Sequence, residues 1–171
     1  MIILKGRSAT REELILVHSK EYIDSIKDTE NLKPKELKKQ AETYNSVYLH
    51  PETWTSACIS TGSLLQVVDS VLNGESQSGI AIVRPPGHHA GENIACGFCI
   101  FNNIAIAAKY AVEFHHVKRY YNRFSFNRLS RVPEIFEKTE SKNSEQRDGV
   151  CLNGLRREAS GVIALVIFVI L

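Results

Sequence analysis

The sequence predicts an α/β fold, in which helices pack against a parallel β-sheet. A long helical pattern over residues 51–72 is followed by an apolar, β-branched run at residues 79–84. Unbroken apolar character in so short a run is typical of an interior strand of a parallel sheet. A second long helical pattern then extends from residue 103 to residue 114. This alternation of helix, strand and helix indicates the class.

Length and composition are those of one ordinary globular domain, or most of one. The chain has 171 residues, of which 43% are hydrophobic and 23% are charged, and this excludes a disordered, collagen-like or coiled-coil protein. The net charge of +2 gives no overall field that would attract nucleic acid or an anionic membrane. Four cysteines in a chain this long do not make a disulfide scaffold.

The amino terminus carries no pattern of a secretory signal. Its apolar start at residues 1–4 is cut short by Lys5 and Arg7. We therefore expect reduced thiols and a location in the cytoplasm, the nucleus or both.

Capping signals mark the first helices. Thr10 and Glu13 have the spacing of a capping box, which predicts a helix over residues 11–17. Ser19 is expected to cap a second helix. That helix carries three apolar residues spaced to share one face: Tyr22, Ile23 and Ile26.

Proline, asparagine and glycine mark the later helices. Pro34 suits the first turn of a helix over residues 34–44. The helix over residues 51–72 is expected to end at Asn73 and Gly74, a common stop signal. Its apolar residues recur every three or four positions, which predicts a well-buried helix. The last helix is expected to be capped by one of two neighbours, Asn102 or Asn103.

The pattern changes near Arg119. Residues 120–131 have neither a strand alternation nor a helical stripe, and residues 134–149 are polar and mixed in charge, as in a solvated or disordered segment. The last eleven residues, 161–171, are uncharged. A membrane-spanning helix needs about 20 apolar residues, so we expect a buried strand or an aggregation-prone tail here and no membrane anchor.

Two adjacent histidines, His88 and His89, follow the turn sequence Pro85-Pro86-Gly87 at the carboxyl end of the expected strand. Open α/β sheets place their ligand sites at such ends. A histidine pair there can act as a general base and as an electrostatic partner to a reacting carbonyl. The alternative is that one histidine packs inside while the other is solvated.

Two further patterns suggest metal or redox chemistry, each with a simpler interpretation beside it. Cys96 and Cys99 have the spacing of a zinc or dithiol pair, but no second cysteine pair is present, and buried structural thiols are favoured. Glu113 and His116 lie one helical turn apart as a weak metal pair. A histidine that stabilises the carboxyl end of the helix is favoured instead.

Three segments together resemble the histone deacetylase family. They are Arg-Pro-Pro-Gly-His-His-Ala at residues 84–90, Cys-Gly-Phe-Cys at residues 96–99 and Phe-Asn-Asn at residues 101–103. The match is nearest to class IIb, which includes a tubulin-directed cytoplasmic deacetylase. The resemblance covers residues 1–119 as the N-terminal part of a catalytic domain, and residues 120–171 form a divergent tail.

The resemblance implies fold, activity and partners. The fold is a partial, truncated arginase/deacetylase-type fold, and the family hydrolyses acetyl-lysine amides with Zn²⁺. The implied partners are acetylated lysine proteins such as histones and tubulin, with no direct binding to nucleic acid or membrane.

The resemblance also implies a role for five residues. His89 matches the general base and acid, and His88 matches the electrostatic partner or proton shuttle. Gly97 and Phe98 match the wall of the tunnel that holds the lysine stem. Ser46 matches a rim serine that accepts a hydrogen bond from substrate.

The chain departs from the family where the metal ligands belong. The family continues into a strand ending in Asp-x-His, but residues 126–129 read Phe-Asn-Arg-Leu. The chain has four aspartates, none of which has a histidine two places later: Asp24, Asp28, Asp69 and Asp148. All three zinc ligands and the oxyanion tyrosine are thus missing from the pattern, so the sequence predicts no metal site in this chain.

We therefore expect the chain to be inactive alone. The alternative function is that of a non-catalytic, truncated isoform that acts as an interaction module. The change of pattern at Tyr120 is interpreted as a translated intron or a shifted reading frame.

Overall fold

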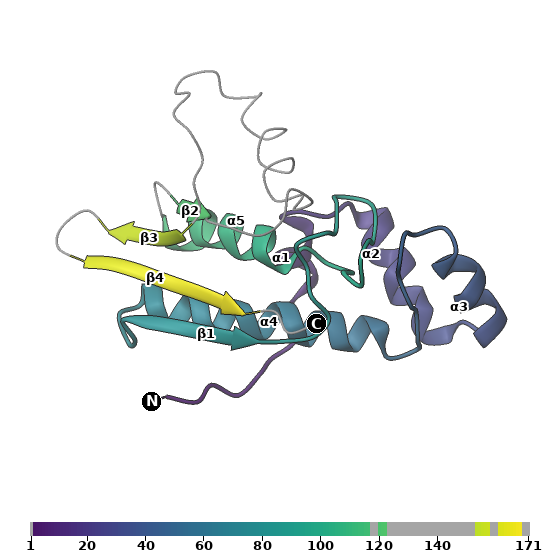
Figure 1. The fold of residues 1–171 in the computed structure, drawn as a ribbon, viewed down its shortest axis with the longest axis horizontal. Helices are drawn as coiled ribbons and strands as arrows, with labels where there is room; N and C mark the ends of the chain where they lie inside the picture. Colours follow the sequence, from purple (N-terminus) through teal and green to yellow (C-terminus); the bar gives the residue numbers. More distant parts are fainter. Residues whose placement is uncertain (1, 117–119, 123–152, 158–160, 169–171) are drawn as a thin grey trace, which may run out of the picture.

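A computed structural model describes residues 2–116, 120–122, 153–157 and 161–168 of the chain. Its elements follow the order helices, strand, helix, strands (Figure 1). They are α1 (Arg11–Ile15), α2 (Lys20–Lys27), the 3-10 turn η1 (Asp28–Asn31), α3 (Pro34–Ala41), α4 (Thr53–Leu72), β1 (Ser78–Ile82), α5 (Asn103–His115), β2 (Tyr120–Asn122), β3 (Asn153–Arg157) and β4 (Gly161–Phe168).

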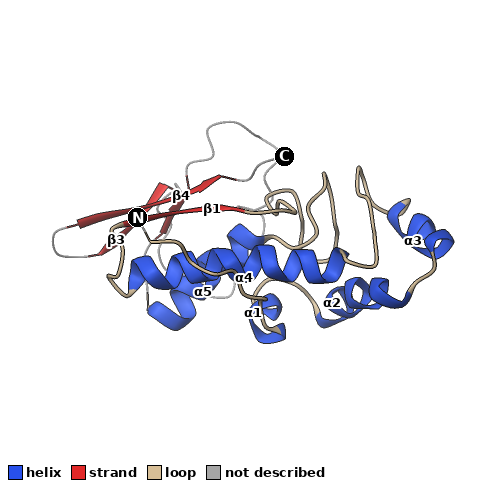
Figure 2. Ribbon diagram, turned by 90° about the horizontal axis from the view of Figure 1, so that it is seen from below, coloured by secondary structure: helices blue, strands red, loops and turns tan. Residues whose placement is uncertain are grey.

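The strands form one layer and the helices lie on one side of it, as Figure 2 shows. The strand order is β1-β4-β3-β2. β1 and β4 are parallel, with Ser78 opposite Ala164, whereas β3 is antiparallel to both β4 and β2. The α/β class is confirmed, but the described sheet is mixed rather than wholly parallel. The three residues between β3 and β4 are too few for the crossover that a parallel connection requires.

The expected caps are present, and the helix ends differ from expectation by a few residues. The Thr10 hydroxyl accepts from the Glu13 N–H at 3.3 Å, and the Glu13 carboxylate accepts from the Thr10 N–H at 2.7 Å. Helix α3 ends at Ala41 rather than Tyr44, because the amides of Thr43 and Tyr44 bond to carbonyls only three residues back, as in a turn. Helix α4 ends as expected, with Gly74 in the left-handed region at φ +80°.

The core is centred on α4. Its buried side chains meet those of α2, α5 and the loop before α5, and the most completely buried include Ile23, Leu64, Leu65, Phe101 and Ile106. Burying each aliphatic side chain of this size contributes about 1.5–3 kcal/mol before the entropy of ordering it is subtracted. This core fixes the two loops that carry the candidate site.

Strand β1 is not the interior strand that its apolar run predicts. It lies at the end of the described sheet, and Ile80 and Ile82 are 58% and 66% exposed on the face turned away from the helices. Only Gly79 and Ala81 face α4. The run is apolar throughout, but among the described elements helices cover one face only.

The C-terminal part of the chain is described in pieces. Residues 161–168 form the strand β4, as expected for that run, whereas 169–171 lie outside the described residues. Residues 120–122 form β2, and the patternless and polar stretches expected over 123–149 lie outside them too. Within the described part of the chain, no helix is long and apolar enough to cross a membrane.

Candidate functional site

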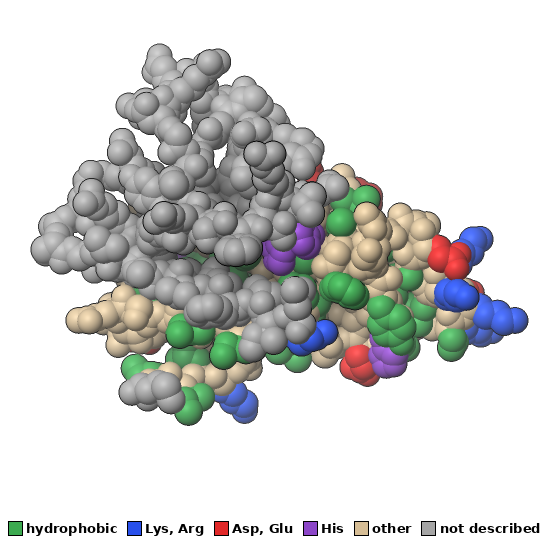
Figure 3. Space-filling view, viewed as in Figure 1, with side chains coloured by type: hydrophobic (Ala, Val, Ile, Leu, Met, Phe, Trp, Pro, Cys, Tyr) green, Lys and Arg blue, Asp and Glu red, His purple; other side chains and the backbone are tan. Residues whose placement is uncertain are grey.

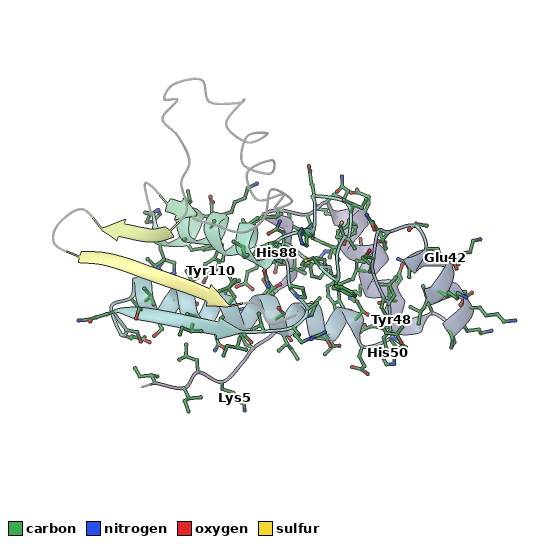
Figure 4. All side chains as sticks on the ribbon, in the orientation of Figure 1. Lys5, Glu42, Tyr48, His50, His88 and Tyr110 are labelled. Carbon is green, nitrogen blue, oxygen red and sulfur yellow. The ribbon has the colours of Figure 1, made fainter. Side chains whose placement is uncertain are left out.

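The tandem histidines lie in the loop that follows β1, on the side of the molecule where Figure 4 labels His88. The rings of His88 and His89 are 3.9 Å apart between centroids and are inclined by 52°. Both side chains are half-buried. The alternative in which one ring is packed inside and the other is solvated is therefore wrong, because the turn before them brings both rings to one place.

The turn is held tightly against the start of α5. A Cβ atom on Gly87 would lie 2.2 Å from Oδ1 of Asn103 and 2.6 Å from the carbonyl oxygen of Phe101, so only glycine fits. The Ala90 N–H closes the turn on the Gly87 carbonyl at 3.1 Å. On the other side, the Ser60 hydroxyl of α4 donates to the Pro85 carbonyl at 2.8 Å. The histidines thus stand on a loop that is anchored to two helices.

A buried polar network behind the loop holds it from within. The Asn102 side chain caps α5 by accepting from the Ala105 N–H and donates to the Ala90 carbonyl at 2.8 Å. The Asn102 N–H in turn donates to Nε2 of His18 at 2.9 Å. Nδ1 of His18 lies 2.8 Å from the Glu92 carbonyl. His18, which follows α1, is therefore connected to the residue that caps α5 and to the segment just after the tandem histidines.

His18 is held neutral in this network. Burial lowers its pKa to about 4, because a charged imidazolium is costly to remove from water. With Nε2 accepting a hydrogen bond, the single proton is on Nδ1 and is donated to the Glu92 carbonyl. The sequence gave no local sign of this role, since 84 residues separate His18 from Asn102.

A second loop brings the remaining candidate residues to the histidines. The Gly97 N–H donates to the Asn45 carbonyl and the Phe98 N–H donates to the Ser46 carbonyl, each at 2.9 Å. Gly97, Phe98 and Ser46 all have a positive φ, between +54° and +64°. A Cβ atom on Gly97 would lie 2.8 Å from Cδ2 of His89, so the turn packs directly on that ring.

The structure therefore gathers all five residues singled out from the sequence. Ser46 lies beside the Gly97–Phe98 turn, the turn lies on His89, and His89 lies on His88. The ring of Phe98 is 57% exposed at this surface. An exposed aromatic face next to two half-buried imidazoles is suited to hold an alkyl stem whose polar end reaches the histidines.

The electrostatics of the pair favour a neutral His88. Burial lowers the pKa of His88, and the neighbouring His89 lowers it further. A neutral imidazole at pH 7 retains a nitrogen lone pair that accepts a proton. The arrangement is thus suited to general-base chemistry.

One cysteine of the second loop, Cys99, is a structural thiol. Cys99 is buried, its pKa is raised to about 11 by burial, and its sulfur accepts from the His89 N–H at 3.4 Å. A redox or metal-binding thiol needs the opposite shift. The redox and zinc interpretations of this pair are therefore wrong at Cys99, and Cys96 is a free, half-buried thiol.

The described residues do not fit a zinc ion. No three histidine, cysteine, aspartate or glutamate side chains among them are placed to hold a metal. Asp24 is paired with Arg11, and Asp69 is paired with Nε2 of His115 at 2.8 Å. The alternative metal pair Glu113–His116 has no third partner in this part of the chain. As favoured from the sequence, His115 lies in the last turn of α5, where a histidine is favourable.

Comparison with known proteins places these observations in a family. Residues 1–121 match the family model of the histone deacetylase domain. The chain is 46% identical over 118 residues to the polyamine deacetylase HDAC10 of Mus musculus, and 45% identical over 116 residues to histone deacetylase 6 of Caenorhabditis elegans. These matches cover 69% and 66% of the chain, but only 18% and 12% of the relatives.

A solved structure agrees with the sequence matches. The HD domain of HDA15 superposes with a TM-score of 0.52 and 31% identity, and the match covers 61% of this chain and 29% of the other chain. The described fold is therefore a partial deacetylase fold. The chain spans less than a fifth of the length of the two curated relatives.

Proposed function

Because the chain belongs to the histone deacetylase family, we propose that its histidine loop and the turn at residues 96–98 form the proton-transfer half of a site for N-acetylated alkylamines. The observation that supports this is the packing of His88 on His89 and of His89 on Gly97, beside the exposed ring of Phe98. Acetyl-lysine in a protein is the substrate class, and class IIb is the subgroup that the named relatives favour.

The site residues have two kinds of role, substrate binding and proton transfer. The Phe98 ring covers the alkyl stem, and Ser46 at the rim accepts a hydrogen bond from a substrate amide. His89 is the general base and acid. His88, held neutral by burial and by its neighbour, supports the proton on His89 or relays it.

Family members are generally zinc-dependent, but the donor set of the described residues does not fit the ion. The sequence offers no Asp-x-His pair either. We therefore propose that the chain binds its substrate and does not hydrolyse it alone. We place the chain in the cytoplasm, the nucleus or both. The second candidate function is a non-catalytic interaction module. It is favoured because the substrate-binding residues Ser46 and Phe98 are present without the zinc ligands.

Hydrolysis and binding are separate measurements on the full chain. With excess zinc, we expect no release of acetate from an acetyl-lysine peptide or from an acetylated polyamine. Zinc-dependent turnover that is lost in His89→Ala would overturn the proposal that the chain is inactive alone. The polyamine is included because relatives are named for that substrate.

Binding tests the site itself. We expect a fluorescent acetyl-lysine peptide to bind the chain more tightly than the same peptide with unmodified lysine. Phe98→Ala is expected to weaken binding at least threefold, and Tyr48→Ala, a similarly exposed aromatic substitution outside the histidine contact, is the matched control. Equal binding of both peptides would contradict the proposed site even if no turnover is seen.

A further inference from the structure

Ser46, the rim residue of the proposed site, has a strained backbone. Its φ is +54°, in the left-handed region that serine rarely adopts and that glycine or asparagine occupies at less cost. Two main-chain bonds of 2.9 Å hold the chain there. The Asn45 carbonyl accepts from the Gly97 N–H, and the Ser46 carbonyl accepts from the Phe98 N–H. Strain that the surrounding structure maintains in this way is typical of functional sites.

The side chain of Asn45 contacts the hydroxyl of Ser46. The hydroxyl donates its proton to Oδ1 of Asn45, with 3.0 Å between the two oxygens. It makes no other hydrogen bond within the part of the chain that the structure describes. A serine hydroxyl has one proton to donate and two lone pairs that accept. Because the proton is bound to Asn45, both lone pairs are left for a ligand.

This bond determines which kind of group the hydroxyl recognises. A hydroxyl that turns freely either donates to a carbonyl or accepts from an N–H. A hydroxyl whose proton is held by an amide oxygen only accepts. The pair of Asn45 and Ser46 is therefore suited to recognise an N–H donor, which is the role that the proposed function gives to Ser46.

The pair lies in the wall of the site. Asn45 forms a parallel bridge with Cys96, the residue before the Gly97–Phe98 turn, and both Asn45 and Ser46 are exposed. In Figure 3 the histidine side chains near the centre of the visible face border hydrophobic and other uncharged side chains. Uncharged surroundings leave recognition to hydrogen bonds and apolar contact, so the direction of one hydroxyl affects affinity.

We propose that Asn45 is a positioning residue of this site, which holds the proton of the Ser46 hydroxyl and thereby turns the oxygen lone pairs toward an N–H of the substrate. The inference rests on the proposed function and adds to it the group that orients the rim. The alkyl stem lies along Phe98 with its polar end at the histidines. The other end of the stem is the backbone of the acetyl-lysine residue, so the N–H at the rim is its backbone amide.

The size of the effect follows from the rotamers of serine. Without Asn45, the Ser46 side chain samples about three staggered positions. An arrangement that is fixed in the parent chain is then populated about a third of the time, so Asn45→Ala should weaken binding about threefold. Ser46→Ala removes the acceptor itself and should weaken binding roughly five- to tenfold.

The test is fluorescence anisotropy of the full chain with two labelled peptides. One contains acetyl-lysine, and in the other an ester oxygen replaces the backbone N–H of that residue. The ester keeps the shape of the amide and lacks the donor. We expect the parent chain to bind the amide peptide roughly five- to tenfold more tightly than the ester peptide. Asn45→Ala should weaken the amide peptide about threefold and leave the ester peptide unchanged.

Two further variants separate orientation from a general effect on the loop. Asn45→Asp keeps an oxygen acceptor at the same place and should bind the amide peptide within about twofold of the parent chain. Thr43→Ala is the matched control. It removes a neighbouring exposed hydroxyl, one that donates to the Gln40 carbonyl at 2.7 Å, and should change the binding of neither peptide.

The free chain provides a readout that does not depend on binding. Three-bond couplings between the α- and β-protons of Ser46 report its χ1 angle. We expect one dominant rotamer in the parent chain and in Asn45→Asp, and averaged couplings in Asn45→Ala. Averaged couplings in the parent chain, or a single rotamer that survives in Asn45→Ala, would overturn the proposal.

Two binding results would also contradict it. One is equal weakening of both peptides by Asn45→Ala, which a merely structural role of Asn45 predicts. The other is loss of binding in Asn45→Asp equal to that in Asn45→Ala, which would mean that the amide nitrogen of Asn45 matters and its oxygen does not. Failure of the parent chain to distinguish acetyl-lysine from lysine would instead overturn the proposed function, and the couplings would still decide whether Asn45 orients Ser46.

Discussion

Nε2 of His18 accepts a hydrogen bond of 2.9 Å from the backbone N–H of Asn102. This bond joins the end of α1 to the residue that caps α5, and through the Asn102 side chain it reaches the loop of the tandem histidines. The ring of His18 also lies 5.3 Å from those of Tyr22 and Phe101. A buried neutral imidazole therefore positions the candidate site without touching it.

The first prediction concerns pH. The pKa of His18 is about 4 in the fold against an ordinary value of 6.5. Between these values the unfolded chain binds the proton and the folded chain does not, so stability falls as the pH is lowered through this window. At about 1.4 kcal/mol per pH unit, the loss amounts to roughly 3 kcal/mol by pH 4.

Urea unfolding at pH 7.5 and at pH 4.5 measures this loss. The control is His18→Gln, whose amide is able to accept from Asn102 and to donate to Glu92 without titrating. We expect the pH dependence of the variant to be flatter than that of the parent chain. Identical slopes would mean that His18 does not carry the acid sensitivity.

Local sequence signals predicted the helix caps. They could not predict contacts between segments that are distant in the sequence. Thr10 and Ser19 cap helices as expected, because a cap depends on residues only three positions away. The Pro-Pro-Gly turn made a shared site for His88 and His89 one of two interpretations, and the packing of the two rings favours it. The His18 network depends on residues 84 positions apart, and no periodicity in the sequence encodes it.

The exposed face of β1 shows a second limit of prediction from the sequence pattern. An apolar run indicates that a strand is suited to burial. It does not indicate which helices or neighbouring strands are present to cover it. Ile80 and Ile82 follow the pattern of an interior strand, yet both are exposed where no helix or strand of the described residues covers them. The family resemblance supplied the roles of Ser46, Gly97 and Phe98, because nothing local links Ser46 to a turn 50 residues away.

A second prediction tests the contact between Gly97 and His89. Gly97→Ala forces a Cβ atom into a left-handed position, φ +55°, and to 2.8 Å from the His89 ring. Gly74→Ala has the same kind of backbone strain at φ +80°, with nothing within 4 Å. We expect a loss of about 1 kcal/mol for Gly74→Ala and a clearly larger loss for Gly97→Ala.

The difference between the two variants isolates the ring contact. Urea unfolding gives the two free energies, and the ring-proton resonances of His89 should shift in Gly97→Ala alone. Equal losses in stability with unchanged His89 resonances would show that the turn does not rest on the ring.

The third prediction concerns the thiols. Burial raises the pKa of Cys58 to about 12 and that of Cys99 to about 11, so less than about one molecule in a thousand carries either thiolate at pH 7.5. We expect iodoacetamide to modify Cys96, which is half-buried, well before these two. Peptide mass mapping over time measures the order, and the guanidinium-unfolded chain is the control in which the difference should disappear. Early modification of Cys99 in the folded chain would restore the redox interpretation.

The last prediction tests the crossing of the N-terminal segment over α4. Alanine is favoured over glycine inside a helix by up to about 1 kcal/mol, so propensity alone would make Gly62→Ala stabilising. A Cβ atom at this position would however lie 2.3 Å from the Arg7 carbonyl oxygen and 2.5 Å from the Ala9 nitrogen. Both are backbone atoms, which yield less easily than the end of a side chain.

We therefore expect the steric term to exceed the helix propensity, with a net loss of at least about 2 kcal/mol in urea unfolding. Faster hydrogen exchange of the Ala9 amide should accompany it, because its bond to the Cys58 carbonyl is pushed apart. Ser63→Ala, one residue further along α4, is the matched control and should leave that amide protected. A Gly62→Ala chain as stable as the parent would mean that residues 7–9 do not lie against the helix.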